Sequence, residues 1–283
     1  MNVNELSKEF LDRYAAERLR PSTLRGYRTN LWKHVSPSLG RKLLADLIPD
    51  DLDELTDTLR ENGLSNKTIV YVHATLRKAI NYAIRRGYTE HNVYDRYDLP
   101  RVEVCPYTVL NDEQFAQMIS NADGRTPVSL AIRLALRYGL RRGEILGIRP
   151  ETDLRERTLH IQRTRSVENG AMTVTPCKTK NADRYILLLE EDAVALRFRG
   201  SGYAIPLTPT QLNKGFVKFL RIGGFPHMRF HDLRHSYATF VYRHGVDLKT
   251  ISTVLGHSGV KITMDIYAHP DPNVQTACLE VLP

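Results

Sequence analysis

The sequence predicts a mainly α-helical protein with a small antiparallel β-sheet, divided into a helical N-terminal domain and an α+β C-terminal domain. Apolar residues recur at helical spacing through about the first hundred residues. A stretch with prolines and no periodicity follows, and beyond Asp153 the pattern changes to that of strands separated by turns. We therefore expect domains at residues 1–98 and 109–283, joined by a linker at 99–108.

Four helices are expected in the N-terminal domain. The first spans Glu5 to Glu17, and the second begins at Pro21. The third follows Pro49, and the fourth is capped by Ser65 and ended by Gly87. The apolar stripe of the fourth helix consists of Ile69, Val72, Leu76, Ile80 and Ala83.

The opposite face of this fourth helix is basic, with Lys67, Arg77, Lys78, Arg85 and Arg86. Such a face is often only a solvated surface. The chain nevertheless carries a net charge of +8, which favours a polyanionic partner. Short helices with basic flanks suit the binding of DNA phosphates, so we expect Lys67, Arg77, Lys78 and Arg85 to contact DNA, together with Lys180 of the C-terminal domain.

The C-terminal domain begins with helices. Residues 111–114 resemble a capping box, and an apolar helix is expected from Pro127 to Tyr138, ending at Gly139. Helical patterns return at Glu191 and again from Pro209 to Ile222.

Strands are expected between these helices. Three segments have the residue pattern of strands: T-L-H-I-Q-R-T, A-M-T-V-T-P and R-Y-I-L-L-L. Turn residues separate them, around Asn169-Gly170 and again at residues 181–183. We expect one small antiparallel sheet, with Lys178 and Lys180 near its second turn.

The stretch from Phe230 to His269 gathers the side chains best suited to chemistry: His231, Arg234, His235, His257 and Tyr267. On a helix, His231 and Arg234 leave from one face because they are three residues apart. Gly256 ends one helix and Ser258 can cap the next, which places His257 at their junction. Cations, imidazoles and a phenol of this kind suit work on a phosphate ester.

Two arginines and a tyrosine stand out further. Arg141 follows a buried helix in G-L-R-R-G-E, where Glu144 can orient its guanidinium, whereas Arg142 fits an ordinary surface position. Together with Arg234 it offers forked donors for phosphodiester oxygens, without a metal ion. Tyr267 fits a core aromatic as well as a nucleophile. A phenol with a pKa of about 10 would need nearby cations and a proton acceptor.

Metal and cofactor sites are not expected. His231 and His235 have the spacing of a zinc pair on a helix, but no cysteine pair or carboxylate cluster offers a third ligand. The three scattered cysteines imply no disulfide framework, and no apolar run approaches the ~20 residues that span a bilayer. We expect a cytoplasmic protein.

Five motifs occur in a fixed order: G-L-R-R-G-E, K-T-K, H-D-L-R-H, L-G-H-S-G-V and M-D-I-Y-A-H. Over roughly residues 108–270 this order and spacing resemble the tyrosine recombinase (phage integrase) family. The helical N-terminal domain resembles that family's SAM-like core-binding domain. Because the chain starts almost directly with these helices, it resembles a simple form without an arm-binding domain, or a form from which that domain was trimmed.

The resemblance implies roles for the main site residues. Arg141 and Arg234 would clamp the scissile phosphate, and Tyr267 would attack it to form a 3′-phosphotyrosyl link. A lysine of K-T-K would protonate the 5′ oxygen that leaves. Both Lys178 and Lys180 lie in this motif, and Lys178 is preferred because K-T is the usual phage-type form.

The remaining roles follow the same resemblance. His231 would assist proton transfer at the nucleophile, His257 would donate a hydrogen bond to the phosphate, and Glu144 matches a supporting acidic residue. Two departures are visible. Tyr138 stands where the family often has a threonine, and R-Y-I-L-L stands where a proline is common.

The family also implies partners. These are duplex attachment sites, a homotetramer acting on two duplexes through a Holliday junction, and a possible accessory DNA-bending or directionality factor, in a bacterial cytoplasm at the nucleoid. The tail at 271–283 could dock onto a neighbouring protomer. The alternatives are an Xer-type chromosome-dimer resolvase, a type IB topoisomerase, and a DNA-binding regulator with a decayed site.

Overall fold

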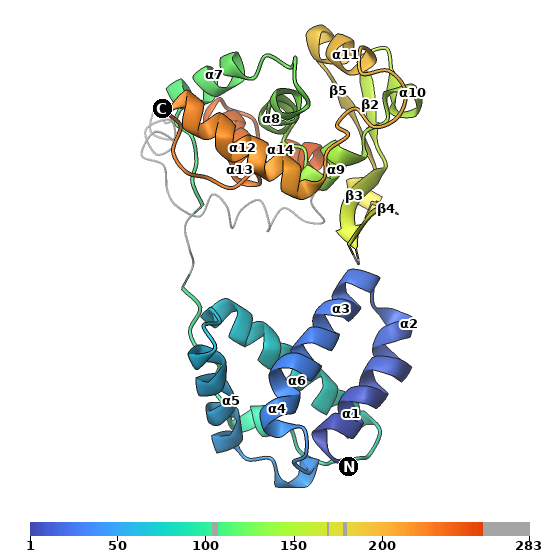
Figure 1. Ribbon diagram of the computed structural model, residues 1–283, viewed down its shortest axis with the longest axis vertical. Coiled ribbons are helices and arrows are strands. Elements are labelled where there is room, and N and C mark those ends of the chain that lie inside the picture. The colour runs from blue at the N-terminus through green and yellow to red at the C-terminus, as the bar shows by residue number, and fades with distance from the viewer. Residues whose placement is uncertain (104–106, 169, 178–179, 257–283) are drawn as a thin grey trace, which may run out of the picture. The chain divides into compact units, whose positions relative to one another are not determined.

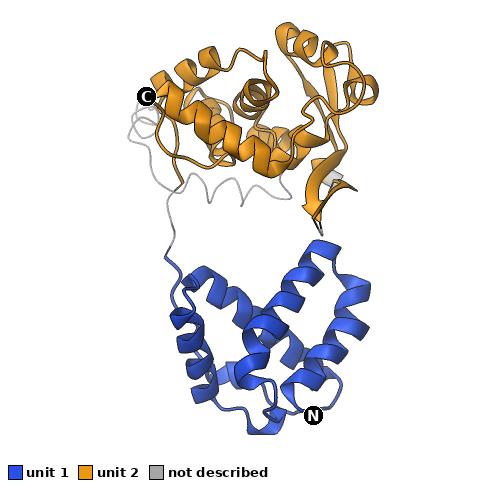
Figure 2. Cartoon of the chain, in the orientation of Figure 1, with its two compact units in different colours: residues 1–105 blue, residues 106–283 orange. Residues whose placement is uncertain are grey.

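The computed structural model describes residues 1–103, 107–168, 170–177 and 180–256. The chain divides into two compact units, Met1–Cys105 and Pro106–Pro283 (Figure 2). The point of division lies inside the stretch 99–108. The prediction of a mainly helical chain with a small amount of antiparallel β-structure is confirmed.

Unit 1 is built from helices, and all four predicted ones are present (Figure 1). The first two each continue through a π-helical segment, and two short 3₁₀ turns follow the second and fourth. The elements are α1 (Val3–Glu9), η1 (Phe10–Ala15), α2 (Ala16–Arg18), α3 (Pro21–Thr29), η2 (Asn30–Val35), α4 (Ser36–Leu39), η3 (Leu44–Asp46), α5 (Pro49–Glu61), α6 (Asn66–Arg85) and η4 (Val93–Arg96).

Side-chain caps and buried apolar faces account for where these helices begin and how they pack. At the start of α1, Asn2 Oδ1 accepts from the backbone N–H of Glu5 (2.9 Å), while the Glu5 carboxylate accepts from the N–H of Asn2 (2.9 Å). Ser65 caps α6 as predicted. The predicted stripe of α6 is buried in the core of unit 1, which has no member in common with the core of unit 2.

A histidine lies inside this core. His73 is fully buried, with Nε2 2.9 Å from Thr56 Oγ1 and Nδ1 2.9 Å from the hydroxyl of Tyr94. Burial disfavours the charged imidazole and lowers the pKa of His73 to about 4. The ring is therefore neutral in the folded protein at neutral pH.

Unit 1 is expected to lose stability in acid because of His73. Below pH 6.5 the unfolded chain binds a proton at this residue, whereas the folded chain stays neutral down to pH ~4. The contribution of neutral His73 to the free energy of unfolding is therefore complete above pH 6.5. It falls by about 3 kcal/mol on going to pH 4. Urea unfolding, followed by the fluorescence of the single tryptophan, Trp32, measures it. His73→Gln should flatten the pH dependence, and equal slopes in both proteins would contradict the assignment.

Unit 2 places helices around the strongly apolar α8 (Figure 1). Its N-terminus is capped by Thr126, and Gly139 ends it in the left-handed region at φ 61°. Asn111 forms the predicted capping box with Gln114. The helices are α7 (Asp112–Asn121), α8 (Pro127–Tyr138), α9 (Arg142–Gly147), α10 (Pro150–Asp153), α11 (Glu190–Arg197), α12 (Pro209–Gly223), α13 (Asp232–Arg243) and α14 (Leu248–Leu255).

The strands form two antiparallel sheets rather than the single one expected. One has the order β1 (Leu154–Arg155), β2 (Thr158–Ile161), β5 (Arg184–Leu187), and the other pairs β3 (Arg163–Glu168) with β4 (Ala171–Pro176). A short 3₁₀ turn, η5 (Lys180–Ala182), precedes β5.

The strand expected over 158–164 changes partner at Gln162. The buried carboxylate of Asp153 accepts hydrogen bonds from the side chains of Gln162 (2.8 Å) and Arg163 (2.8 Å), which holds this corner. No helix in the described part of the chain is long and apolar enough to cross a membrane.

Candidate active site

Three arginines from separate elements meet at the C-terminal end of α14. They donate to successive backbone carbonyls: Arg184 Nε to Val254 O (2.6 Å), Arg234 Nη2 to Leu255 O (2.7 Å) and Arg141 Nη2 to Gly256 O (3.1 Å). The last carbonyls of a helix lack partners within the helix and carry partial negative charge. Guanidinium groups satisfy both needs, and this helix end therefore gathers cations that lie far apart in the sequence.

Arg141 stands at the N-terminus of α9. Its backbone N–H donates to Glu144 Oε2 (2.9 Å) and its Nη1 donates to Glu144 Oε1 (2.7 Å), which is the contact expected from the sequence. About a third of the Arg141 side chain, 32%, remains exposed. Part of this cation is therefore fixed by the protein while part faces solvent.

Glu144 is held between two arginines. Its side chain is 1% exposed, and Arg184 donates to it twice, from Nη1 to Oε1 (3.1 Å) and from Nη2 to Oε2 (3.0 Å). Burial acts to raise the pKa of Glu144, but the hydrogen bonds and charge of Arg184, with those of Arg141, outweigh it and hold this pKa below its ordinary value. The carboxylate therefore stays ionised. Arg184 was not among the predicted site residues.

Arg234 is buried in α13, at 3% exposure. Besides its bond to Leu255, its Nη1 donates to the carbonyl of Gly139 (2.6 Å), directly after α8. The start of α13 is fixed by buried Asp232, which accepts from the backbone N–H of Arg229 (2.8 Å). Arg234 therefore joins the ends of two helices at the same place.

His231 lies at the N-terminus of α13, beside these cations. The residue is exposed, and its ring lies edge-on to that of His235 at 4.9 Å between centroids. Desolvation by the surrounding protein, and then the positive charges of His235, Arg234 and Arg141, lower the pKa of His231 to about 4. At neutral pH the imidazole is uncharged and can accept a proton.

His235 lies one turn further along α13. Its ring stacks on that of Tyr107 at 4.6 Å between centroids, and burial lowers the pKa of His235. Among the residues that the structure describes, no group of three or more His, Cys, Asp or Glu side chains could hold a metal ion.

Comparison with known proteins identifies the family. Residues 108–273 match the model of the phage integrase family, and residues 2–60 match that of the phage integrase N-terminal SAM-like domain. The chain belongs to the phage integrase family.

Relatives of this integrase-family chain bear recombinase and transposase names. A tyrosine recombinase XerC-like protein of Caldanaerobacter subterraneus subsp. tengcongensis is 29% identical over 266 residues, covering 79% of this chain and 68% of the relative. The transposase from transposon Tn916 of Enterococcus faecalis is 27% identical, covering 82% of this chain and 65% of the relative. The chain thus spans about two thirds of the length of these relatives.

A solved structure shows the same fold. The Tn1549 transposon integrase (aa 82–397, Y379F), in complex with transposon right end DNA, superposes with a TM-score of 0.83. The match covers 100% of this chain and 99% of that one, at 22% sequence identity.

The integrase-family motifs fall partly outside the described residues. Lys178, His257 and Tyr267 lie there, and the side chain of Lys180 is not described either. The structure brings together Arg141, Arg234 and His231, with Glu144 as support. The sequence missed Arg184, although its place two residues before the apolar Ile186 of the same strand was a signal for an inward side chain.

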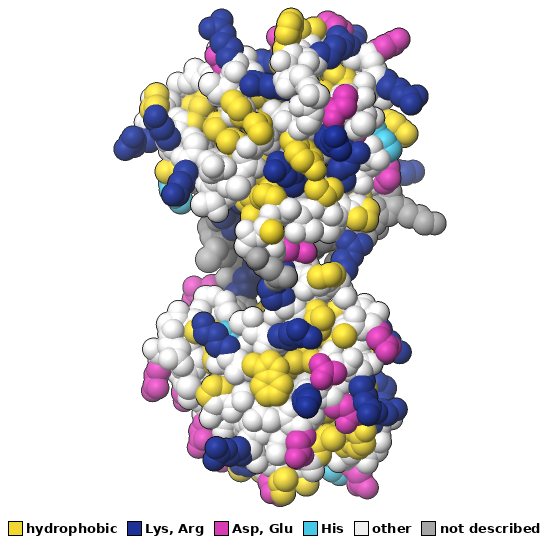
Figure 3. Space-filling view, turned by 45° about the vertical axis from the view of Figure 1, so that its right-hand side comes forward, with side chains coloured by type: hydrophobic (Ala, Val, Ile, Leu, Met, Phe, Trp, Pro, Cys, Tyr) yellow, Lys and Arg dark blue, Asp and Glu magenta, His cyan; other side chains and the backbone are white. Residues whose placement is uncertain are grey.

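The basic face of α6 is exposed as predicted. Three of its cations also contact other residues of unit 1: Arg77 pairs with Asp95 (3.7 Å), Lys78 Nζ donates to the hydroxyl of Tyr27 (2.7 Å), and the Arg85 guanidinium lies 5.7 Å from the ring of Tyr14. Figure 3 shows basic side chains scattered over the visible face of this unit, with acidic and hydrophobic ones between them. DNA contact by Lys67, Arg77, Lys78, Arg85 and Lys180 stays a prediction.

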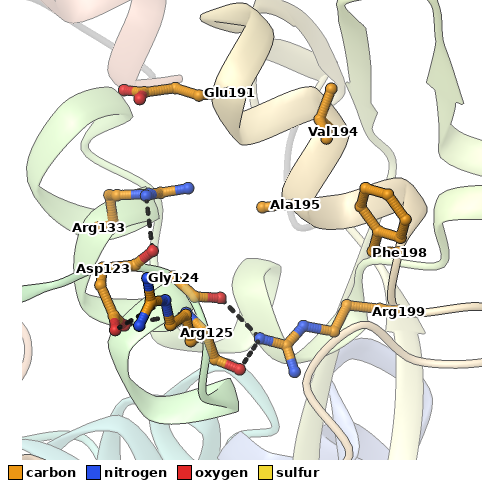
Figure 4. A pocket seen from close by; sticks show the side chains of 9 residues that line it. All are labelled: Asp123, Gly124, Arg125, Arg133, Glu191, Val194, Ala195, Phe198 and Arg199. Atoms are coloured by element: carbon orange, nitrogen blue, oxygen red, sulfur yellow. Dashed lines mark hydrogen bonds and ion pairs between the residues drawn. The ribbon is translucent and has the colours of Figure 1, made fainter.

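A cavity of about 500 Å³ lies elsewhere in unit 2 (Figure 4). Its lining groups bond to one another: Arg133 donates to the carbonyl of Asp123 (3.0 Å), and Arg199 donates to that of Gly124 (2.7 Å). None of the arginines at the end of α14 lines it. This cavity is therefore separate from the cluster of arginines at the end of α14.

Gly256 is expected to be essential to the site. It ends α14 at φ 65°, and an added Cβ would lie 2.7 Å from the carbonyl oxygen of Asn181 and 3.0 Å from Arg184 Nη1. Gly256→Ala should cost about 1–2 kcal/mol of stability through backbone strain, and should slow DNA cleavage at least ~10-fold by shifting the helix end.

Gly245 provides the matched control for this change. It also has positive φ, 85°, but a Cβ there would meet no described atom within 4 Å. Gly245→Ala should therefore lower the melting temperature with cleavage unchanged. Equal cleavage by both variants would show that the position of the helix end does not matter.

Proposed function

We propose that the chain is a site-specific DNA recombinase of the phage or mobile-element integrase type, which cuts and rejoins duplex DNA at attachment sites. The observation that carries this proposal is the meeting of Arg141 and Arg234 at the end of α14, with neutral His231 beside them. Two fixed guanidiniums suit the non-bridging oxygens of one phosphodiester. The family membership supports the same reaction.

The proposed reaction has two proton transfers. The phenolic oxygen of Tyr267 forms a bond to phosphorus, and the bond from phosphorus to the 5′ oxygen breaks, leaving a 3′-phosphotyrosyl link and a 5′-hydroxyl. His231 receives the phenol's proton, and Lys178 gives a proton to the leaving oxygen. Arg141 and Arg234 stabilise the charge on the phosphate. The reversal of this step with another strand rejoins DNA without an external energy source, because the ester preserves the bond energy.

Two further residues of the proposed site support this reaction without forming or breaking a bond to phosphorus. His257 donates a hydrogen bond to the phosphate, and Glu144 keeps Arg141 in place. The family resemblance supports a homotetramer on two duplexes with a Holliday-junction intermediate, in the bacterial cytoplasm. Docking of the 271–283 tail onto a neighbouring protomer is proposed from its apolar residues Val274, Leu279 and Val281. An accessory DNA-bending or directionality factor is a further expected partner.

Cleavage is expected to tolerate mild acid because of the pKa of His231. The neutral imidazole is the active form, so the rate falls only as the pH drops through this pKa, about 4. At pH 5.5 kcat/KM, which reports the free enzyme, should stay within about twofold of its value at pH 7. A histidine with the ordinary pKa of about 6.5 would lose about tenfold. A loss of that size in the parent protein would contradict this assignment.

A nicked suicide substrate tests the proposed function. Footprinting on DNA that flanks the gene locates the binding site, and a nick close to the scissile phosphate lets the cleaved fragment diffuse away and traps the intermediate. A covalent protein–DNA adduct that resists denaturation is the expected result. Sequence-specific binding without any adduct would instead indicate a DNA-binding regulator.

An Xer-type resolvase is the second candidate, compatible with the XerC-like name of one relative. It would share the chemistry and differ in its sites. Recombination between two copies of the flanking DNA, and none between copies of the host's chromosome-dimer resolution site, would support the integrase type. Relaxation of supercoiled plasmids that lack both sites would favour a topoisomerase.

A further inference from the structure

Arg184 is fully engaged by the protein. Its side chain is 8% exposed, and its guanidinium donates to the carbonyls of Val254 (2.6 Å) and Ala182 (3.0 Å) as well as to both oxygens of Glu144. Its Nε, Nη1 and Nη2 all donate to acceptors within the protein. Arg184 therefore acts on the site through the groups that it holds.

One of those groups, Glu144, also contacts Arg141, the cation proposed to bind the phosphate. Glu144 receives Arg184 on one side and Arg141 on the other, so the same carboxylate orients both guanidiniums. A buried carboxylate needs such partners, because its charge is costly without them. If Arg184 were lost, Arg141 would be the one remaining partner of Glu144 among the described residues, and Arg141 would be drawn towards the carboxylate.

Arg184 also fixes the end of α14. Its bond to Val254 is the first of the three arginine–carbonyl bonds there, and the Gly256 carbonyl receives Arg141. The chain continues from Gly256 towards His257 and Tyr267. One side chain therefore links the orientation of Arg141 with the point from which the segment carrying the proposed nucleophile departs.

We propose that Arg184 is a positioning residue for DNA cleavage, which sets the orientation of Arg141 through Glu144 and anchors the end of α14 through Val254. This inference rests on the proposed function of the same site. Lysine cannot replace it, because a single ammonium cannot make the two parallel bonds to Glu144 and also reach the Val254 carbonyl.

Single-turnover cleavage of the nicked substrate, with enzyme in excess over DNA, tests the proposal. Arg184→Lys should lower the cleavage rate about 100-fold, the scale of a small misplacement of a catalytic group, while the Kd for DNA changes by less than about threefold. Arg133→Lys is the matched control, because Arg133 has a similarly buried pair, with Asp192 at 2.6 Å, away from the α14 end. A similar slowing by both variants, or by neither, would overturn the proposal.

A double-mutant cycle shows whether Arg184 acts through Glu144. Glu144→Gln alone should also slow cleavage, and the double variant should be no slower than the worse single one, since both changes break the same link. Losses that multiply would show independent roles and would overturn this path. Arg184→Gln serves as a second variant, and thermal melting by circular dichroism confirms that each protein is folded before its rate is compared.

The outcomes separate this inference from the proposed function. If the parent protein forms no adduct on its own site, the proposed function fails. If the parent forms the adduct and folded Arg184→Lys forms it at the parent's rate, only the role of Arg184 fails.

Discussion

Tyr267→Phe is expected to abolish the covalent protein–DNA adduct completely. The change removes only the hydroxyl oxygen that would bond to phosphorus, and no other group in the proposed reaction supplies it. DNA binding should persist, because the arginines that hold the phosphate are unchanged. Denaturing gel electrophoresis of the nicked-substrate reaction measures the adduct, and a mobility shift measures binding.

Tyr185→Phe is the control for the loss of one phenolic oxygen. Tyr185 lies on β5 and is 70% exposed, with its ring stacked against His160 at 4.3 Å between centroids. Its variant should form the adduct at the parent's rate. An adduct formed by Tyr267→Phe would show that another residue of the chain is the nucleophile.

Arg141→Lys is expected to reduce the single-turnover cleavage rate by about 10²–10³-fold. Lysine keeps the charge but loses the fork that bonds Glu144 and the Gly256 carbonyl while facing a phosphate. The effect should fall on the rate rather than on the Kd for DNA, because the interaction strengthens as charge develops on the phosphate.

The adjacent arginine provides a close control. Arg142 donates to the side chain of Asn213 (3.1 Å) and has no bond to Glu144 or to the end of α14 in the described part of the chain. Arg142→Lys should therefore cleave within about threefold of the parent, the scale of an exposed polar contact. Equal losses in both variants would indicate a general need for arginine in this turn.

Helices were predictable where local signals agree. In α6 the Ser65 cap, the apolar stripe and Gly87 all lie within one stretch of sequence, and the helix has these bounds. The same holds for α8 between Thr126 and Gly139. Such signals need no knowledge of what the helix packs against.

The sheets were less predictable because their pairing depends on distant residues. The segment around Gln162 has an unbroken strand pattern, yet its two halves pair with β5 and with β4. The change is fixed by hydrogen bonds to Asp153, which no local pattern reveals.

The site was predictable only in part, for a similar reason. Arg141 and Glu144 lie one helical turn apart, so their contact follows from sequence. The alternation of β5 places Arg184 on the same side as buried Ile186, with Tyr185 and Leu187 exposed, but nothing in the local sequence shows that its partners are Glu144 and the Val254 carbonyl. The backbone carbonyls that accept from the arginines could not be predicted either. Every residue has a carbonyl, so the sequence does not show which ones the arginines reach.

The attachment of α14 has a consequence for motion. Among the described residues, its buried apolar contacts come from a small cluster of Ala238, Ile251 and Leu255, with partly buried side chains such as Tyr237 and Val241 packed against it, whereas α8 lies in the large core of unit 2. The bonds from three arginines to carbonyls at its C-terminal end add to this small cluster in holding the helix. Regions with few buried apolar contacts open at a lower free energy than the core, so α14 can undergo local excursions and faster amide exchange while the rest of the unit stays folded.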